Sequence, residues 1–314
     1  MIKKAFKTTV IIALAFVIGF GIFSTVKYYK GISETGIQHN IPVGFGKEAT
    51  VIFLAGQSNA AGCSQDEYLK MNVSPEKYEE YERGYDNVYI NYYVSGTNQS
   101  DGFVKCAARQ GEFGICFGPE LGLAERLHEL YPDRTFFIIK YAFGGTNLYE
   151  QWLSPSSGKP GDLYNGFIDY AKNSIRYLEL KNYKVKIEGM CWMQGEADSM
   201  EEESTLNYAK HLNNFINDIR DEFSDYASDN GIAFVDAYIS NSFFWKHFAL
   251  LNEQKQAVAD SSPNNVVIDT ISHGLSITEE PKDEPDIAHY DSLSEIKLGH
   301  LFAEEIIKFL DEPK

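Results

Sequence analysis

The sequence predicts a three-layer α/β/α protein, in which helices cover both faces of a mostly parallel central sheet. From Thr50 to the C-terminus, short apolar runs alternate with amphipathic helical patterns, an alternation typical of parallel sheets. Several runs are apolar on both faces, as strands buried inside such a sheet are. Unusual polar clusters follow three of these runs, at the edge where open α/β sheets bind ligands.

The strands are expected where Val, Ile, Phe and Tyr gather in short runs. These runs cover residues 50–55, 87–93, 135–141, 186–193, 232–236 and 265–269. Helices are expected between them, over residues 119–130, 163–180, 203–226 and 291–310. Pro119 occupies the favoured first position of its helix, and Ser292 and Glu295 have the spacing of a capping box in the last one.

The first 30 residues are expected to lie outside this fold. Residues 8–26 form a run of 19 uncharged residues, and as a helix it spans about 28 Å, close to the ~30 Å hydrocarbon core of a bilayer. The run lacks a clear cleavage site, so residues 1–30 are predicted to be a membrane anchor, with a cleaved secretory signal as the alternative. Residues 31–48 then form a tether and residues 49–312 the folded domain, which both alternatives place outside the cytoplasm.

The charge of the chain is strongly uneven. The first 30 residues hold five lysines and no acidic residue, whereas the remainder holds 23 basic and 45 acidic residues, a balance of −22. A body this acidic repels the phosphate backbone of nucleic acids, so nucleic-acid binding is not expected. The balance suits neutral or partly neutral substrates.

The four cysteines give no sign of a metal centre. The sequence has no C-x-x-C pair and no His/Cys spacing that resembles a zinc site, so no metal is expected. Outside the cytoplasm Cys106 and Cys116 are candidates for a disulfide that closes a small loop. The alternative is four unpaired thiols.

The segment VIFLAGQSNAAG, residues 51–62, places a serine directly after the first expected strand. At that position Ser58 is a candidate nucleophile, provided that a base lies within hydrogen-bond reach. The common alternative is that the serine is a helix N-cap. Gln57 and Asn59 flank it and either shape the turn or line the site.

His289 is the candidate base. Asp286 lies three residues before it, a spacing that lets a carboxylate contact the imidazole ring and fix its tautomer in a turn before a helix. The alternative is a surface histidine in an acidic loop. Among the other histidines, His273 is the one serious rival.

Two further clusters supply candidate oxyanion donors. FGGTN, residues 143–147, ends a strand with two glycines, where the backbone N–H groups of Gly144 or Gly145 can approach a substrate closely. QGEAD, residues 194–198, offers the Gln194 amide as a second donor and Glu196 as a carboxylate near the base. An ordinary turn and an exposed strand end are the alternatives.

Sugar-stacking aromatic residues are also expected near these clusters, and the candidates are Tyr92, Tyr93, Tyr149 and Trp152.

The blocks FLAGQSNAAG, GPE, KYAFGGTNL, WMQGEAD and DIAHYDSLSEIKLGHLFA resemble, in this order, those of SGNH/GDSL-type hydrolases. The resemblance points to the branch that holds carbohydrate esterase family 6 and the sialate O-acetylesterases, and it covers roughly residues 49–309. It implies a flavodoxin-like α/β/α fold, a serine esterase activity, and no metal or organic cofactor.

The resemblance also implies a role for each candidate residue. Ser58 would be the nucleophile, and its own N–H would help to hold the oxyanion. Gly144 would be the second oxyanion donor, with Gly145 as an alternative, and Gln194 would stand where many relatives have an asparagine. His289 would be the base.

Two carboxylates compete to orient this base: Asp286, the usual partner, and Glu196, the glutamate of the QGE block. The function implied is removal of O-acetyl groups from a carbohydrate of the acetyl xylan or sialic acid type. An ordinary α/β-hydrolase is a weaker alternative, because its nucleophile motif G-x-S-x-G does not occur at Ser58. A non-catalytic carbohydrate-binding or surface protein that keeps the hydrolase fold is the alternative from another class.

Overall fold

The computed structural model describes residues 41–310. The predicted anchor over residues 1–30 and residues 31–40 of the tether lie outside the described residues, and so does everything predicted from them about the membrane and localisation. Within residues 41–310, no helix combines the length and apolar character needed to span a bilayer.

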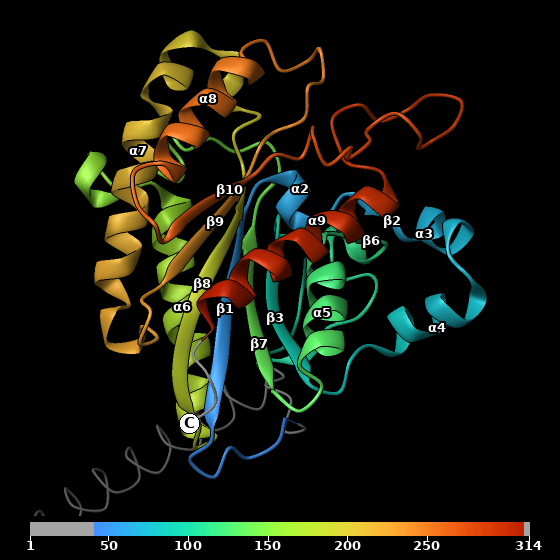
Figure 1. The fold of residues 1–314 in the computed structure, drawn as a ribbon, viewed down its shortest axis with the longest axis vertical. Coiled ribbons are helices and arrows are strands. Elements are labelled where there is room, and N and C mark those ends of the chain that lie inside the picture. The colour runs from blue at the N-terminus through green and yellow to red at the C-terminus, as the bar shows by residue number, and fades with distance from the viewer. Residues whose placement is uncertain (1–40, 311–314) are drawn as a thin grey trace, which may run out of the picture. The chain divides into compact units, whose positions relative to one another are not determined.

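Six parallel strands form the centre of the sheet, in the order β10-β9-β8-β1-β7-β3 (Figure 1). Their bounds are β1 (Glu48–Gly56), β3 (Val88–Val94), β7 (Phe136–Ala142), β8 (Lys184–Met193), β9 (Ala233–Ala237) and β10 (Asn265–Ile268). All six match expected strands. β1 lies in the middle, which explains why eight of its nine residues are buried.

Four short strands lie outside this parallel core. β4 (Asn98–Gln99) and β5 (Val104–Lys105) pair antiparallel with β3, at the edge of the sheet. β2 (Ser64–Gln65) and β6 (Cys116–Phe117) form a separate antiparallel pair. The fold is therefore the predicted α/β class, with a mixed sheet that is mostly parallel.

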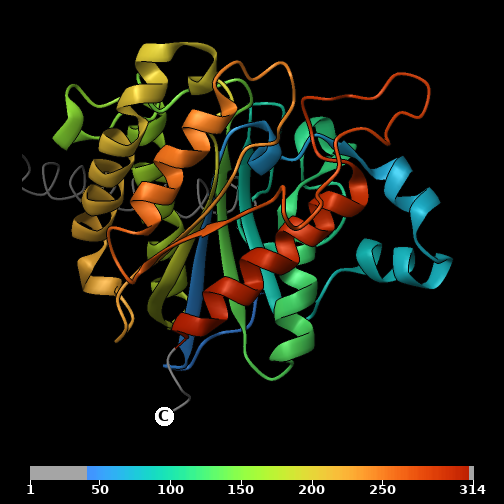
Figure 2. The same ribbon diagram turned by 45° about the horizontal axis from the view of Figure 1, so that its top comes forward.

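Helices cover both faces of the sheet, as Figures 1 and 2 show. α5 (Pro119–Leu130) and α9 (Ser292–Ile306) cross one face, while α6 (Asp162–Leu180) and α7 (Glu202–Glu222) cover the other. On this second face Phe53 of β1 packs edge-on against Phe167 of α6. The remaining helices are α2 (Ser58–Ala61), α3 (Asp66–Asn72), α4 (Pro75–Arg83) and α8 (Phe248–Ala259). Short 3-10 turns are η1 (Glu112–Gly114), η2 (Pro155–Ser157), η3 (Asp198–Met200), η4 (Ser224–Tyr226) and η5 (Ile307–Phe309).

Two glycines allow α5 and α9 to pack backbone against backbone. A Cβ at Gly122 would lie 2.0 Å from the carbonyl oxygen of Ile296, and one at Gly299 would lie 2.2 Å from that of Pro119. Any side chain at these positions would force the helices apart. This contact fixes the start of α9, and with it the loop that carries His289.

One local prediction is wrong, and one question that the sequence left open, the Cys106–Cys116 disulfide, is answered by the structure. The capping box of the last helix does not form, because the helix begins at Ser292 with Asp291 as its N-cap, and the Ser292 hydroxyl donates to Glu280 at 2.6 Å. Cys106 and Cys116 are both unpaired and buried. The thiol of Cys106 donates instead to the carbonyl oxygen of Glu120 at 3.4 Å, because α5 packs directly against it.

Candidate active site

Ser58 is the first residue of α2, at the carboxyl edge of the central strand. The turn is tight, since a Cβ at Gly56, whose φ is +141°, would lie 1.9 Å from the carbonyl oxygen of Met193. Gln57 is the N-cap and no side chain caps the helix, so the alternative of Ser58 as a capping residue is wrong. As the first helical residue, Ser58 has a backbone N–H that α2 itself cannot satisfy.

His289 and Asp286 form a close pair in the loop before α9. His289 Nδ1 and Asp286 Oδ2 are 2.6 Å apart. An ionised carboxylate only accepts hydrogen bonds, so Nδ1 carries the hydrogen and Nε2 is left as the basic nitrogen. Asp286, rather than Glu196, is therefore the carboxylate in contact with the ring.

Asn59 connects this loop to the serine and to the QGEAD segment. Its amide nitrogen donates to Glu196 Oε1 at 2.7 Å, and its oxygen accepts from the backbone N–H of Tyr290 at 3.1 Å. The neighbours of Ser58 and His289 are thus hydrogen-bonded to each other. Within residues 41–310 neither Ser58 Oγ nor His289 Nε2 makes a hydrogen bond, so the expected serine–histidine hydrogen bond is not formed here. Catalytic hydrogen bonds of this kind commonly tighten only when substrate binds.

The electrostatics favour a protonatable His289. Burial lowers the pKa of this imidazole, but the hydrogen bond to Asp286 and the negative charges of Asp286, Glu196 and Glu112 outweigh burial and raise the pKa above its ordinary value. The same hydrogen bond lowers the pKa of Asp286. The pair is therefore suited to hold a proton in transit while Asp286 stays ionised.

Glu196 lies beneath the site and is fully buried. One carboxylate oxygen accepts from Asn59, and the other has no hydrogen-bond partner among the described residues. Burial raises the pKa of this carboxyl. Its role in this geometry is to hold Asn59 and to add negative charge near His289.

The two glycines of FGGTN, in the turn after β7, have different surroundings. A Cβ at Gly144 would lie 3.6 Å from the Ser58 Cβ, so this glycine borders the serine directly. Its N–H donates to the hydroxyl of Ser95 at 2.9 Å. Gly145 has φ +68° and open space at its Cβ position, so here glycine serves the backbone conformation.

Gln194 is fully buried and its amide is already engaged. The amide nitrogen has two hydrogens, and three acceptors lie within reach: Gln57 Oε1 at 3.2 Å, the Thr146 carbonyl at 2.9 Å and Asp198 Oδ2 at 2.6 Å. The side chain therefore braces Gln57 and the two loops. The oxyanion role predicted for Gln194 would require these bonds to rearrange, and it stays a prediction.

Sequence reasoning did not single out Glu112 or Ser95, which border Gly144 together with Ser58. Glu112 is in η1, and its carboxylate accepts the hydroxyl hydrogen of Ser95. Glu112 Oε1 lies 3.0 Å from the Cβ position of Gly144. The rival base His273 is exposed in the loop after β10, where its carbonyl accepts from Lys297, and within the described chain it makes no contact with Ser58.

The aromatic predictions are partly wrong. Trp152 is fully buried and Tyr92 is nearly so, because both pack in the core beside the sheet. The exposed rings include Phe113, which is 66% exposed next to Glu112 in η1, and also Phe243 and Phe244, whose centroids are 4.9 Å apart and which are 80% and 49% exposed in the loop after β9. Since β9 is parallel to β1, that loop leaves the sheet at the same edge as Ser58 (Figure 1).

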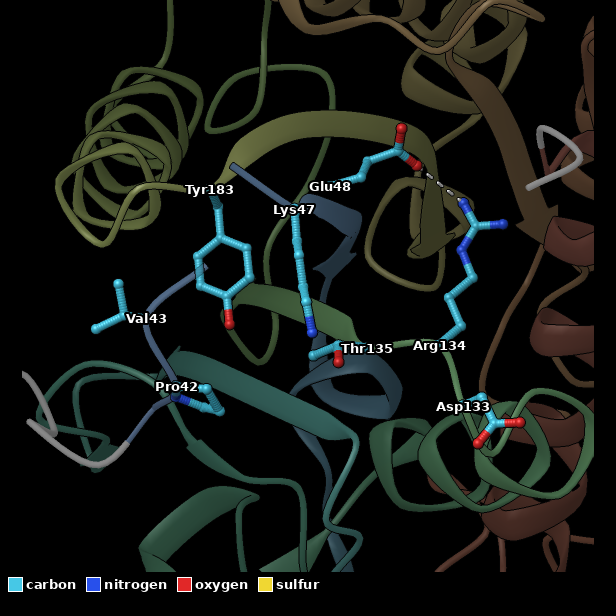
Figure 3. A pocket seen from close by; sticks show the side chains of 8 residues that line it. All are labelled: Pro42, Val43, Lys47, Glu48, Asp133, Arg134, Thr135 and Tyr183. Atoms are coloured by element: carbon cyan, nitrogen blue, oxygen red, sulfur yellow. Dashed lines mark hydrogen bonds and ion pairs between the residues drawn. The ribbon is translucent and has the colours of Figure 1, made fainter. Parts of the chain in front are cut away.

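Two cavities lie at opposite edges of the sheet. A cavity of about 260 Å³ lies at the amino ends of the strands, where Glu48 and Arg134 pair at 3.4 Å, and Figure 3 shows the side chains that line it. A smaller cavity of about 30 Å³ borders His289 and Asp286. The larger cavity is remote from the candidate catalytic groups, so volume does not identify the site here. In residues 41–310 no cluster of three or more His, Cys, Asp or Glu side chains is arranged to hold a metal ion.

Comparison with known proteins agrees with this architecture. The family model described as "Carbohydrate esterase, sialic acid-specific acetylesterase" matches residues 48–308. No curated protein sequence matches the chain.

Solved structures are similar in fold. A protein from Arabidopsis thaliana gives a TM-score of 0.60 at 15% identity, covering 84% of this chain and 100% of its own. NanS gives 0.59 at 16% identity, covering 84% and 98%. A carbohydrate acetylesterase from Xanthomonas citri gives 0.53 at 15% identity, covering 81% of this chain and 55% of its own.

Proposed function

The chain belongs to the carbohydrate esterase family of sialic acid-specific acetylesterases and is a carboxylic ester hydrolase, and from this membership we propose that it removes O-acetyl groups from a carbohydrate through an acyl-enzyme on Ser58. The observation that carries the mechanism is the Asp286–His289 pair, held beside Ser58 by the Asn59 hydrogen bond to Tyr290. The sugar would be of the acetyl xylan or sialic acid type.

In the first half-reaction Ser58 Oγ attacks the acetyl carbonyl carbon, and His289 Nε2 takes the hydroxyl proton. Collapse of the tetrahedral intermediate breaks the bond to the sugar oxygen, which receives that proton from His289 and leaves as a free hydroxyl. In the second half-reaction water attacks the acetyl-serine and His289 takes a proton from it; collapse breaks the bond to Ser58 Oγ, which receives that proton, and acetic acid leaves and ionises to acetate. Asp286 stays ionised and stabilises the imidazolium in both steps.

The oxyanion would be held by backbone donors. The N–H of Ser58 is one, and the N–H of Gly144 is the second once it turns from the Ser95 hydroxyl to the substrate. Gly145 and Gln194 are the further candidates. Each such donor contributes on the order of 3 kcal/mol to lowering the barrier.

Acetate release tests this function. Purified residues 31–314 should release acetate from p-nitrophenyl acetate and from acetylated xylan or O-acetylated sialic acid, and Ser58→Ala should lose at least about a thousandfold in kcat. Ser224→Ala, an exposed serine in η4 at the opposite edge of the sheet, is the matched control and should keep full activity. Full activity of Ser58→Ala would refute the mechanism, and a chain without esterase activity would favour the non-catalytic carbohydrate-binding protein.

We also propose, from the sequence alone, that residues 8–26 anchor the enzyme outside the cytoplasm. Fractionation of expressing cells tests this: the full chain should sediment with membranes, and a chain that lacks residues 1–30 should not. Release of a processed, soluble chain would favour the cleaved signal.

A further inference from the structure

The groups that border the serine are unusually rich in negative charge. Glu112 Oε1 lies 3.0 Å from the Cβ position of Gly144, which in turn lies 3.6 Å from the Ser58 Cβ. The carboxylate is therefore at most 6.6 Å, the sum of these distances, from the Cβ of the nucleophile. Glu196 and Asp286 lie on the other side, bonded to Asn59 and to His289.

Glu112 is held in place from both its backbone and its side chain. Its N–H donates to the carbonyl oxygen of Gly62, the residue directly after α2, at 2.9 Å. Its carboxylate accepts from Ser95, which also accepts the N–H of Gly144. The charge is thus fixed beside the place where an acetyl group must bind, and not carried on a freely moving surface side chain.

The lysines beneath this edge of the sheet do not offset that charge toward a substrate. Lys140 is fully buried and pairs with Glu120 at 2.6 Å. Lys255 is almost fully buried and pairs with Asp236 at 2.6 Å. Each of these two cations is paired with a buried carboxylate, and neither faces solvent.

We propose that Glu112 makes this site selective for O-acetyl esters of uncharged sugars and disfavours esters of anionic sugars, an inference that rests on the proposed function. A sugar carboxylate bound about 8 Å from Glu112 is repelled enough to lower kcat/KM about fivefold at an effective dielectric constant of about 40. The repulsion falls with ionic strength, because the Debye length is about 8 Å at physiological salt.

A pair of substrates that differ in charge and by one methyl group tests this directly: 9-O-acetyl-N-acetylneuraminic acid and its carboxyl methyl ester. The full-length chain should release acetate from the methyl ester with a kcat/KM about fivefold higher or more at low salt, and this ratio should shrink in 0.5 M NaCl. Glu112→Gln, which keeps an acceptor for Ser95, should reduce the ratio about fivefold. Glu253→Gln removes the same unit of charge from the exposed face of α8 and should leave the ratio unchanged.

Equal or faster hydrolysis of the free acid by the wild-type chain would overturn the inference, and so would a ratio that Glu112→Gln and salt leave unchanged. The wild-type comparison and its salt dependence need no variant, so they decide the question even where Glu112→Gln folds poorly. Absence of acetate release from every substrate, p-nitrophenyl acetate included, would instead refute the proposed function itself.

Discussion

Replacing Asp286 by asparagine tests how the site orients and charges its base. Asp286 Oδ2 lies 2.6 Å from His289 Nδ1, and asparagine removes the negative charge while it preserves the size of the side chain. The comparison variant is Glu196→Gln, which removes a carboxylate that contacts Asn59 and not the ring. The two variants therefore separate the carboxylate that touches the base from the one that only lies near it.

The structure sets the size of the expected effect. In the proposed mechanism His289 takes the serine proton, and an imidazolium forms about 4 Å from the Asp286 charge, an attraction of about 1 kcal/mol in bulk water and about 4 kcal/mol near a protein surface. The Asp286 side chain is 53% exposed, so solvent screens it. We expect a loss of about 1.4–2.7 kcal/mol, or about ten- to a hundredfold in kcat/KM. Glu196→Gln should cost less than about tenfold.

The pH profile gives a second readout that a purely structural loss would not change. His289 acts as a base only when neutral, so kcat/KM rises with pH through its pKa, which Asp286 holds above the ordinary value. Asp286→Asn should therefore move this acidic limb to lower pH. Hydrolysis of p-nitrophenyl acetate from pH 5 to 9 measures both quantities. Equal small losses, a larger loss in Glu196→Gln, or an unmoved limb in Asp286→Asn would refute the assignment.

Two further predictions concern the frame and the rim of the site. Asp198 accepts hydrogen bonds from the backbone N–H groups of Leu148 and Tyr149, at 2.8 and 3.1 Å, and from the Gln194 amide. Asp198→Asn replaces one acceptor oxygen by a donor nitrogen and should therefore lower the free energy of unfolding by about 2 kcal/mol. Urea denaturation measures this, with the exposed Asp225→Asn as an unchanged control, and equal midpoints would contradict it. Phe243→Ala should raise KM for acetylated xylan several-fold, because an exposed ring at this edge can stack on a sugar next to the acetylated one. The KM for p-nitrophenyl acetate should not rise, because that substrate has no neighbouring sugar. Equal effects on both substrates would contradict the prediction.

The helices and strands that can be predicted are those whose buried residues recur with a regular apolar period. All six parallel strands and four long helices were expected, because their buried residues are mainly aliphatic or aromatic. α8 was missed since its buried residues include Asn252 and Lys255, which break that period. α4 was missed because only two tyrosines, Tyr78 and Tyr81, are buried along it.

The residues of the candidate site also divide into those that the sequence predicts and those that it does not. Ser58 stands at a strand end and the His289–Asp286 pair just before a helix, so the parallel topology predicts that both lie at the same edge of the sheet. Glu112 lies in a 3-10 turn between two-residue strands, where no periodicity marks its position. For Gln194 the sequence pattern predicts the position but not the role, because only the structure shows that Asp198, Thr146 and Gln57 already accept its amide hydrogens.

The hydrogen bond from Tyr290 to Asn59 joins residues 231 positions apart, which sets an order of events during synthesis. Ser58 is synthesised long before His289. No nascent chain that ends before residue 289 contains both candidate catalytic residues, and the loop with His289 is fixed only when α9 docks against α5. Long-range contacts of this kind form late in folding. Esterase activity should therefore appear only after α9 has been synthesised and has docked, and shorter nascent chains should be inactive.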